Sequence, residues 1–501
     1  MRPPRRPRLL AAFLLTPLLT GCFASPGDGD SGEAADGKDG ARLRVALAFP
    51  PVENLSPYGA DATILSRLGV TEGLTALDAN GAAAPALASS WRRENDRSWL
   101  FTLREAVFQD GTEVTPAAVV TALIGAGRAE PVPAALTGVT LTAEARGATG
   151  VRITTAEPDP VLPLRLASPG LAVLAPKAYE EKGAVDPVGT ATGPFELTEV
   201  TGTTAAALDR FDDHWGGRAQ ASGIDARFIA DGTARANALR TGQIDLAEAI
   251  PVAQAATLDA GSRRETATTR TTSLLLNTRS GVFKDASLRA AARAAVDTGV
   301  LADGVHEGHA DPGAGIYGPA VTWAGAKRVT PVGRVEAGKP EGASITLATY
   351  DNRPELPEVA QVLKQQLENA GFVVRLEVRA YARLESDALA GTFDAFVGAR
   401  NSLLDTGDPV SLLASDFTCD GGYNLALLCD KDVDRAVERA RAVADTGKRQ
   451  DAALAAEAVI LGTDAVVPLV HQRVITGVAA SVGGVLLDPY ERTLVGTGTR
   501  R

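Results

Sequence analysis

Alternating and periodic hydrophobic positions predict a mixed α/β chain. Residues 344–350 and 372–378 are short apolar runs with β-branched residues, which is typical of strands. Between them, residues 356–370 carry apolar side chains at helical spacing, which predicts an amphipathic helix. A further apolar run at residues 393–397 follows, so this part of the chain is expected to form an α/β domain built on a strand–helix–strand unit.

The same patterns predict elements elsewhere in the chain. Strands are expected at residues 42–49, 99–107, 171–176 and 466–470, and helices at residues 64–74, 433–443 and 448–461. Thr115 directly before Pro116 predicts the start of another helix, because threonine caps a helix and proline fits its first turn.

The stretch after the strand at 393–397 holds two carboxylates in a polar turn. Asp408 precedes Pro409, so Asp408 is expected to cap a helix and to have a structural role. Asp405 stays free in the loop at the end of the strand. Since open α/β sheets bind ligands in the crevice at their strand ends, Asp405 is the stronger candidate for a binding role.

Length and charge restrict the class of protein. A chain of 501 residues is too long for a single hydrophobic core, so two or three domains are expected. The formal net charge is −11, which argues against binding to nucleic acid or to anionic lipid.

The first forty residues have the pattern of an export signal and a tether. Four arginines precede an apolar run at residues 9–20, which fits a signal peptide and is too short to span a bilayer. The run ends in Leu-Thr-Gly-Cys, which resembles a bacterial lipobox with Cys22 as the lipidated residue; an ordinary signal peptide with a chance cysteine is the alternative. Residues 25–40 are rich in Gly, Asp and Ser and are expected to form a flexible tether.

Two cysteines remain if Cys22 carries lipid. Cys419 and Cys429 are expected to form a disulfide outside the cytoplasm, with two buried free thiols as the alternative. Two cysteines without a nearby histidine cluster make a poor zinc site, and neither a metal site nor a cofactor is expected.

Several motifs in a fixed order resemble one family. They are Glu-Gly-Leu at 72–74, PALASSW at 85–91, FQDGT at 108–112, GPF at 193–195, TTSLLLNTR at 271–279, DTGDP at 405–409 and CDGGYN at 419–424. Together they resemble the family 5 extracellular solute-binding proteins of ABC transporters, which include the oligopeptide- and dipeptide-binding proteins. The resemblance covers nearly the whole chain after the tether.

The resemblance implies a two-lobed, hinge-linked α/β fold of the type II periplasmic-binding-protein kind, with an extra domain. The chain is expected to cross to its second lobe at residues 271–279 and to return at 466–470. The expected division is 1–21 signal peptide; 22–40 lipidated cysteine and tether; 41–76, 176–272 and 471–501 first lobe; 77–175 extra domain inserted in the first lobe; and 273–470 second lobe.

The resemblance also implies a ligand site. In peptide binders of the family, an aspartate four residues before the proline accepts the α-ammonium of the ligand, and counting back from Pro409 gives Asp405. The peptide binders have Gly-Trp just ahead of that aspartate, with the tryptophan three residues before it, where this chain has Asn401-Ser402. Arg400, Asn401 and Tyr423 are further candidates, and Arg400 could hold a carboxylate or pair with Asp405.

The expected function is capture of a small solute, in the first place a short peptide, for an ABC importer. The expected partners are the permease subunits and their ATPases, with a lipid anchor holding a monomer on the outer face of the bacterial cytoplasmic membrane. Alternatives on the same fold are a binder of a nickel chelate, sugar or opine, or a peptide-sensing lipoprotein.

A secreted hydrolase is the competing class. The chain has no G-x-S-x-G elbow, and His306-Glu307-Gly308-His309 is one residue short of the zinc motif H-E-x-x-H. Four histidines in total leave little general-base chemistry, so no catalytic residue is expected. His214 and Trp215 are expected to serve packing.

Overall fold

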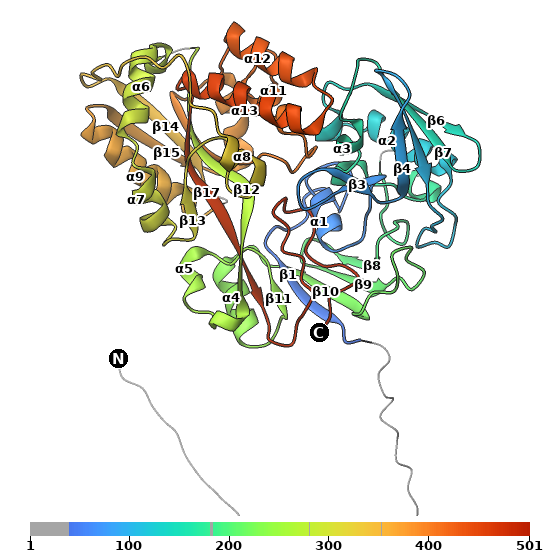
Figure 1. The fold of residues 1–501 in the computed structure, drawn as a ribbon. Coiled ribbons are helices and arrows are strands. Elements are labelled where there is room, and N and C mark those ends of the chain that lie inside the picture. Colours follow the sequence, from blue (N-terminus) through green and yellow to red (C-terminus); the bar gives the residue numbers. More distant parts are fainter. Residues whose placement is uncertain (1–39, 181–183, 280, 352) are drawn as a thin grey trace, which may run out of the picture. The chain divides into compact units, whose positions relative to one another are not determined.

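Two long antiparallel strands, β12 (Arg263–Leu276) and β17 (Val466–Val478), lie at the centre of the largest sheet (Figure 1). The computed structural model describes residues 40–180, 184–279, 281–351 and 353–501, and within these ranges eleven strands form this sheet. The expected signal peptide, Cys22 and the tether up to residue 39 lie outside the described residues.

The strands on the two sides of the central pair come from different stretches of the chain. Strands β16, β14 and β15 follow β12 on one side and are called the second lobe here; β11, β1, β10, β9 and β8 follow β17 on the other and are called the first lobe. The second-lobe strands are β14 (Ser344–Tyr350), β15 (Val373–Arg379) and β16 (Ala395–Asn401), and the first-lobe strands are β1 (Leu43–Leu47), β8 (Phe195–Thr201), β9 (Ala205–Arg210), β10 (Gly223–Phe228) and β11 (Leu246–Ala247). A short strand, β13 (Ala310–Pro312), also pairs with β17.

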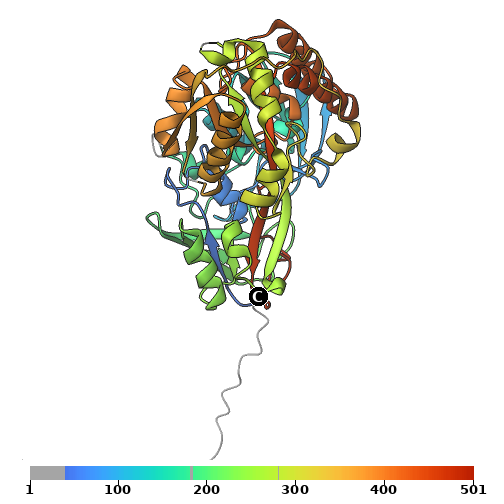
Figure 2. The same ribbon diagram turned by 90° about the vertical axis from the view of Figure 1, so that its left-hand side faces the viewer.

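The central pair belongs to both lobes. β12 pairs with β16 through residues 270–276, whereas β17 pairs with β11 at Gly477 and Val478. The β12–β17 register shifts between Ala267 and Thr271, where the pair passes from one lobe to the other. Figure 2 shows the two strands running together along this path. The crossings expected at 271–279 and 466–470 stay a prediction; in the structure, residues 466–470 pair with residues 272–275 of β12, and β17 continues to Val478.

The predicted strand–helix–strand unit of the second lobe is confirmed. It consists of β14, α9 (Glu355–Asn369) and β15, and the two strands pair in parallel. The buried face of α9 carries Leu356, Val359, Leu363 and Leu367, each fully inaccessible to solvent, at helical spacing. This apolar stripe packs against β14 and β15.

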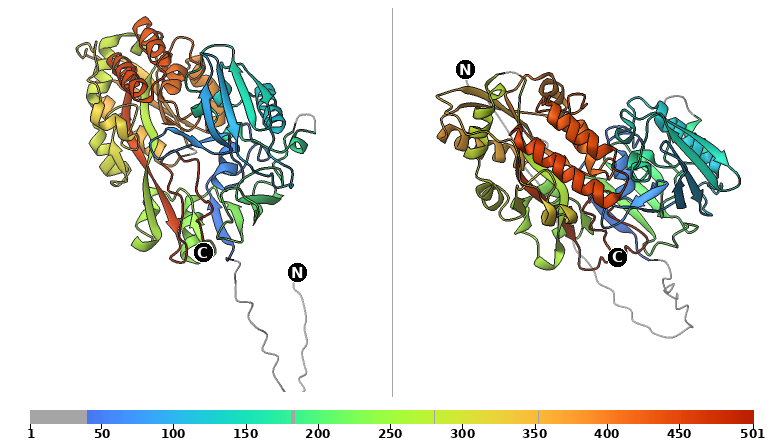
Figure 3. Two further views of the ribbon diagram at one scale, coloured as in Figure 1. Left: turned by 45° about the vertical axis from the view of Figure 1, so that its right-hand side comes forward. Right: turned by 45° about the horizontal axis from the view of Figure 1, so that its top comes forward.

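The other α-helices are shorter than α9, apart from α13. They are α1 (Ala62–Arg67), α2 (Pro116–Arg128), α3 (Leu162–Arg165), α4 (Gly232–Arg240), α5 (Val252–Ala255), α6 (Ala286–Ala295), α7 (Thr298–Val300), α8 (Thr322–Lys327), α10 (Tyr381–Ala390), α11 (Pro409–Phe417), α12 (Lys431–Arg441) and α13 (Thr446–Gly462). Helices α11, α12 and α13 pack on one another around a core of their own, and Figure 3 shows α12 and α13 side by side.

A separate four-stranded sheet lies within the stretch expected to be an extra domain. Its strands pair in the order β4 (Ala88–Arg93), β5 (Ser98–Leu103), β7 (Gly150–Thr155) and β6 (Leu141–Arg146), and a two-stranded hairpin of β2 (Thr75–Leu77) and β3 (Ala83–Pro85) precedes it. Helix α2 packs against this sheet, and Thr115 caps it as predicted by accepting a hydrogen bond from the Ala118 N–H at 3.2 Å. The exact domain boundaries stay a prediction.

Two predicted elements differ most from the structure, one in extent and one in type. The helix expected at 64–74 ends at Arg67, because Gly69 takes a left-handed backbone conformation (φ 68°) that terminates it. Residues 171–176 form no strand. Their backbone bonds to loops instead, Val173 to Glu72 and Ala175 to Thr190, so burial of an apolar run here did not require a strand partner.

Candidate ligand-binding site

A cavity of about 810 Å³ is lined by residues of both lobes, of the central strands and of the inserted region. This volume lies in the range of small-molecule sites. Most lining residues are apolar. The charged residues of its lining are Asp61, Arg67, Arg270, Arg353, Arg400, Asp405, Asp416 and Glu491.

Strand β16 places Arg400 and Asn401 at the cavity. The predicted strand at 393–397 is displaced toward the C-terminus, because pairing with β12 continues as far as Arg270 opposite Asn401. Arg400 and Asn401 are therefore the last two residues of a strand and not part of the following turn. Their backbone is fixed by the ladder, and only their side chains can adapt.

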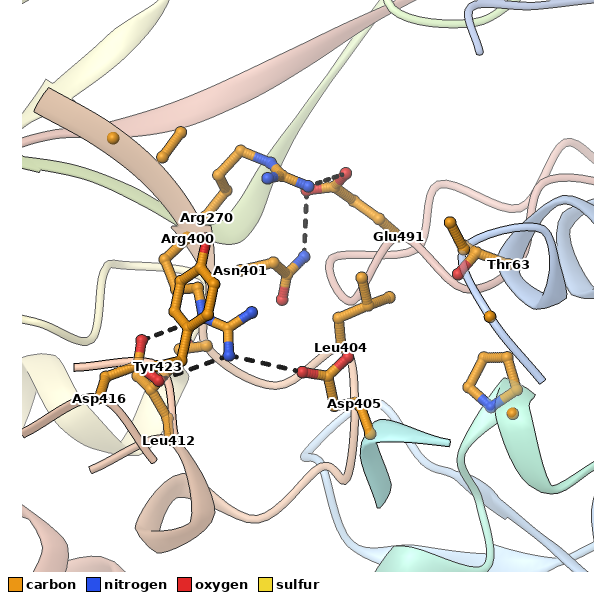
Figure 4. Close-up of a pocket in the computed structure, with 18 of the residues that line it drawn as sticks. Thr63, Arg270, Arg400, Asn401, Leu404, Asp405, Leu412, Asp416, Tyr423 and Glu491 are labelled. Atoms are coloured by element: carbon orange, nitrogen blue, oxygen red, sulfur yellow. Dashed lines mark hydrogen bonds and ion pairs between the residues drawn. The ribbon is translucent and has the colours of Figure 1, made fainter. Parts of the chain in front are cut away.

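Arg400 lies between two carboxylates (Figure 4). Its Nε donates to Asp416 Oδ2 at 3.0 Å, and its Nη2 lies 3.7 Å from Asp405 Oδ2. The guanidinium also lies 4.7 Å from the centre of the Tyr423 ring, within range of a cation–π contact. Burial would lower the pKa of Arg400, but Asp416 and Asp405 outweigh it and raise that pKa. Burial also raises the pKa of Asp416, although Arg400 opposes it.

Asp405 and Asp408 have different surroundings. Asp408 is buried, accepts from the Val410 N–H at 3.3 Å, and forms two hydrogen bonds with Arg449 at 2.7 and 2.8 Å. The predicted cap at the start of α11 is thus present, with an ion pair in addition. The Asp405 side chain is 38% exposed and faces the cavity. Of the two carboxylates, Asp405 is the one that a solute in the cavity can reach.

A buried ionic network joins the central strand to the C-terminal segment, and the sequence analysis missed it. Arg270 donates to both carboxylate oxygens of Glu491, at 3.1 and 2.9 Å, and the Asn401 amide donates to Glu491 Oε1 at 3.1 Å. Arg67 lies 3.6 Å from Glu491 and 2.7 Å from Glu248. Asn401 is therefore held within this network, and Figure 4 shows its amide pointing toward Glu491.

Glu491 gives the network a predicted pH dependence. Burial alone would raise the pKa of Glu491, but the charge and hydrogen bonds of Arg270 outweigh burial and lower that pKa to about 2. Because the folded-state pKa is depressed, the stabilisation is complete well above the ordinary pKa of about 4.3 and is lost as the pH falls from about 5 toward 2. We expect Glu491→Gln to lower the free energy of unfolding by roughly 3 kcal/mol at pH 7 and by progressively less below pH 4.

Urea unfolding of both proteins between pH 2.5 and 7 measures this difference. A free-energy difference that stays constant over that range would mean that Glu491 carries no depressed pKa in the folded protein.

Arg353 is a further charged residue of the cavity that no sequence motif indicated. It lies three residues after the end of β14, and its guanidinium is 5.8 Å from the centre of the Phe49 ring. Its ion pair with Glu355 is long, at 3.9 Å. Burial and the neighbouring charge of Arg270 lower the pKa of Arg353, so an anion in the cavity would stabilise its charged form. The strand-end argument applied to Asp405 could have pointed to this residue.

The expected disulfide joins Cys419 and Cys429 in the structure. Within the loop that it closes, the Asn424 amide donates to the carbonyl oxygens of Thr418 and Leu428 at 2.9 and 2.7 Å. These bonds hold the short loop in one shape. The loop in turn carries Tyr423 to the cavity beside Arg400.

The histidine motifs of the sequence lie away from the cavity lining. His309 pairs with Glu265 at 3.0 Å, while His214 and Trp215 both bind the carboxylate of Glu72, at 3.1 and 2.8 Å. Among the described residues, no group of three or more His, Cys, Asp and Glu side chains is placed to hold a metal ion. No helix in this part of the chain is both long enough and apolar enough to cross a membrane.

The structure brings all four predicted site residues to the same cavity. Arg400, Asn401, Asp405 and Tyr423 line it together. Asn401 is bound to Glu491 and Arg400 to Asp416, whereas Asp405 lies at the longer distance of 3.7 Å from Arg400. Their contact with a ligand stays a prediction.

The comparison with known families identifies the chain. The model of the bacterial extracellular solute-binding proteins, family 5, matches residues 82–424, more than half of the chain. The chain belongs to this family. The glutathione-binding protein GsiB of Escherichia coli (strain K12) is 27% identical over 469 residues, covering 87% of this chain and 90% of that protein.

Solved structures of other proteins share the fold of this chain. NikA from Staphylococcus aureus in complex with Ni(L-His)2 gives a TM-score of 0.76 at 20% identity, covering 92% of this chain and 100% of the other. DppA from Helicobacter pylori in complex with the peptide STSA also gives 0.76, at 18% identity, covering 92% and 98%. The expected two-lobed α/β fold of the type II binding proteins is confirmed.

Membership in family 5 defines the role in outline. The chain is an extracytoplasmic solute-binding protein that serves an ABC transporter. The relatives are binding proteins and not enzymes. Their names include a glutathione binder, a nickel-chelate complex and a peptide complex, so the family alone leaves the solute open.

Proposed function

We propose that this protein is a lipid-anchored receptor that captures a short peptide outside the cytoplasmic membrane and delivers it to an ABC permease. The balance of charge in the cavity carries the proposal for the ligand. Four arginines and four carboxylates stand among the described residues of the lining. A buried site without net charge suits a zwitterion, because a ligand with charge of one sign would leave an uncompensated ion in a low dielectric.

The two ends of such a zwitterion have candidate partners. Asp405 lies 3.7 Å from Arg400, longer than a hydrogen bond, so its carboxylate can accept from a ligand ammonium group. Arg353, with its long contact to Glu355, can donate to a ligand carboxylate. Glutathione, the ligand named for the GsiB relative, is a peptide that carries an ammonium group and two carboxylates, so it also has charges of both signs.

Capture is proposed to occur by closure of the lobes. The cavity has walls from both lobes, so a solute that contacts both binds the closed arrangement better than the open one. The central strands β12 and β17 connect the lobes, and the register shift between Ala267 and Thr271 marks the place where their ladder is interrupted. This place is our candidate for the hinge.

A chelated metal is the second candidate, favoured by the structural similarity to NikA bound to Ni(L-His)2. In that case the chelating groups would bring the metal ligands, and Arg353 would hold a carboxylate of the chelator. A sensing lipoprotein with the same cavity differs in its partners and not in its binding chemistry.

A thermal-shift screen of the purified protein tests the proposal. Ligation raises the melting temperature by mass action, so a bound peptide at 100 times its Kd adds about 2.7 kcal/mol of stability. We expect shifts with di- to pentapeptides or glutathione, and weaker shifts when the same peptide is N-acetylated or C-amidated, because each block removes one charge.

The control set contains nickel–histidine chelates and oligosaccharides. Shifts with these compounds and none with any peptide would overturn the peptide proposal. Equal melting-temperature shifts with free and blocked peptides would support a peptide ligand. They would contradict the binding of its ammonium group by Asp405 and of its carboxylate by Arg353.

A further inference from the structure

The face of the β12–β16 pair that lines the cavity changes along its length from charged to small to apolar. Three directly opposed pairs lie on it: Thr271 with Arg400, Ser273 with Gly398, and Leu275 with Phe396. Successive pairs are two residues apart on each strand, so their side chains share one face, and all six residues line the cavity. The intervening Leu274 and Val397 belong to the core of the second lobe instead.

The middle pair brings the least side-chain volume to this floor, and the part of the floor at Ser273 is called the hollow here. Ser273 and Gly398 carry the two smallest side chains of the three pairs. The Phe396 ring takes the space above Gly398, since a Cβ at position 398 would lie 2.7 Å from Phe396 Cε1, so the open part of the pair is at Ser273. The ring thereby forms one side of the hollow.

Apolar residues from other elements line the same part of the cavity. Leu412 comes from α11, Leu425 from the segment after Tyr423, and Val466 from the start of β17, where it pairs with Leu275. Leu412 and Val466 are buried, and Leu425 is half-buried. The charged residue of this face, Arg400, lies at the other end of the three pairs, where it donates to Asp416.

We propose that this hollow is a subsite for an apolar side chain of the ligand, and that Ser273 sets the size it accepts. The inference rests on the proposed function, since it assigns a side-chain class to the peptide that the cavity would hold. Asp405 and Arg353 hold the charged ends of the ligand, and the hollow selects among peptides by the volume of one residue.

Apolar burial gives the expected magnitude. Each buried methylene tightens binding by roughly fourfold, so a leucine in the hollow should bind at least tenfold more tightly than an alanine there. A peptide residue that lies outside the hollow should show a much smaller dependence on size.

Isothermal titration of the purified protein with dipeptides tests this. The set is Gly-Gly, Gly-Ala, Gly-Leu and Gly-Phe, with Ala-Gly, Leu-Gly and Phe-Gly, so that each position varies separately. Wild type is expected to prefer leucine or phenylalanine at one position. Ser273→Leu fills the hollow and is expected to weaken binding of the large peptides at least tenfold while Gly-Gly and alanine peptides change less than threefold.

Ser273→Ala is the matched control, because it keeps the position small and should leave the size preference unchanged. Leu425→Ala is the second variant, which should widen the hollow and shift the preference from leucine toward phenylalanine. Leu425→Ala tests the role of the hollow if Ser273→Leu does not fold.

The outcomes separate this inference from the proposed function. Wild type that binds peptides without regard to side-chain size, or a Ser273→Leu variant that weakens every peptide equally, overturns the hollow and leaves the peptide receptor in place. Wild type that binds longer peptides in the thermal-shift screen but none of these dipeptides overturns this subsite and leaves the receptor in place. Wild type that binds neither the dipeptides nor any longer peptide overturns the proposed function and this subsite with it.

Discussion

Replacing Asp405 by asparagine is expected to weaken peptide binding about 100-fold. The change keeps the size of the side chain and removes the negative charge that faces the cavity. A ligand ammonium group would then be buried beside Arg400 with no carboxylate of its own, and loss of one partner of a desolvated charge pair costs about 2–5 kcal/mol. Isothermal titration with a peptide from the screen measures the change in Kd. Most of this change should come from faster dissociation of the peptide.

The matched control is Asp420→Asn, which removes a carboxylate from the exposed part of the Cys419–Cys429 loop and should leave affinity unchanged. The melting temperature of unliganded Asp405→Asn should stay close to wild type, because Asp405 is 38% exposed. Unchanged peptide affinity in Asp405→Asn would remove the ammonium-binding role and would leave the transport role standing.

Replacing Arg449 by leucine is expected to destabilise the protein by about 3–5 kcal/mol. Arg449 and Asp408 are buried, with side-chain exposures of 5% and 2%, and share two hydrogen bonds. Burial alone would raise the pKa of Asp408, but Arg449 outweighs it and keeps that pKa below its ordinary value. Without Arg449, the carboxylate that caps α11 is left unpaired in the interior.

Arg449 also donates through Nη1 to the backbone at the end of α12. Its acceptors are the carbonyl oxygens of Ala440, Arg441 and Val443, at 3.0, 2.8 and 2.9 Å. Loss of these bonds adds to the destabilisation because the acceptors stay buried or half-buried.

Urea unfolding at pH 7 measures the effect. The matched control is Arg435→Leu on α12, where an exposed pair with Asp432 should contribute less than about 1 kcal/mol. Equal losses of unfolding free energy in Arg449→Leu and Arg435→Leu would show that the buried ion pair stabilises the protein no more than the exposed one.

The sequence predicted the second lobe well because its signals are local. In residues 344–378 the apolar side chains repeat at strand and helix spacing. Asp408 and Pro409 are adjacent residues that together indicate the start of a helix. The failures occurred where tertiary contacts decided the backbone. Residues 171–176 are apolar enough for a strand, yet their backbone partners are loops at Glu72 and Thr190.

The site was predictable only in the part that lies on one continuous stretch. Arg400, Asn401, Asp405 and Tyr423 are within 24 residues of each other, and the motifs around them drew attention to all four. The opposing charges could not be found in this way. Arg270 and Glu491 are 221 positions apart, and only the folded chain brings them together.

The path of the chain through the sheet has a consequence for the order of folding. The first lobe contains residues from both ends of the described chain: β11 pairs with the end of β17, the Gln220 N–H donates to Thr497, and the Val495 N–H donates to Arg67. During synthesis, all of the second lobe emerges before these last residues exist. The lobe that begins first is therefore completed last, and a chain truncated after β12 would expose an unpaired strand edge.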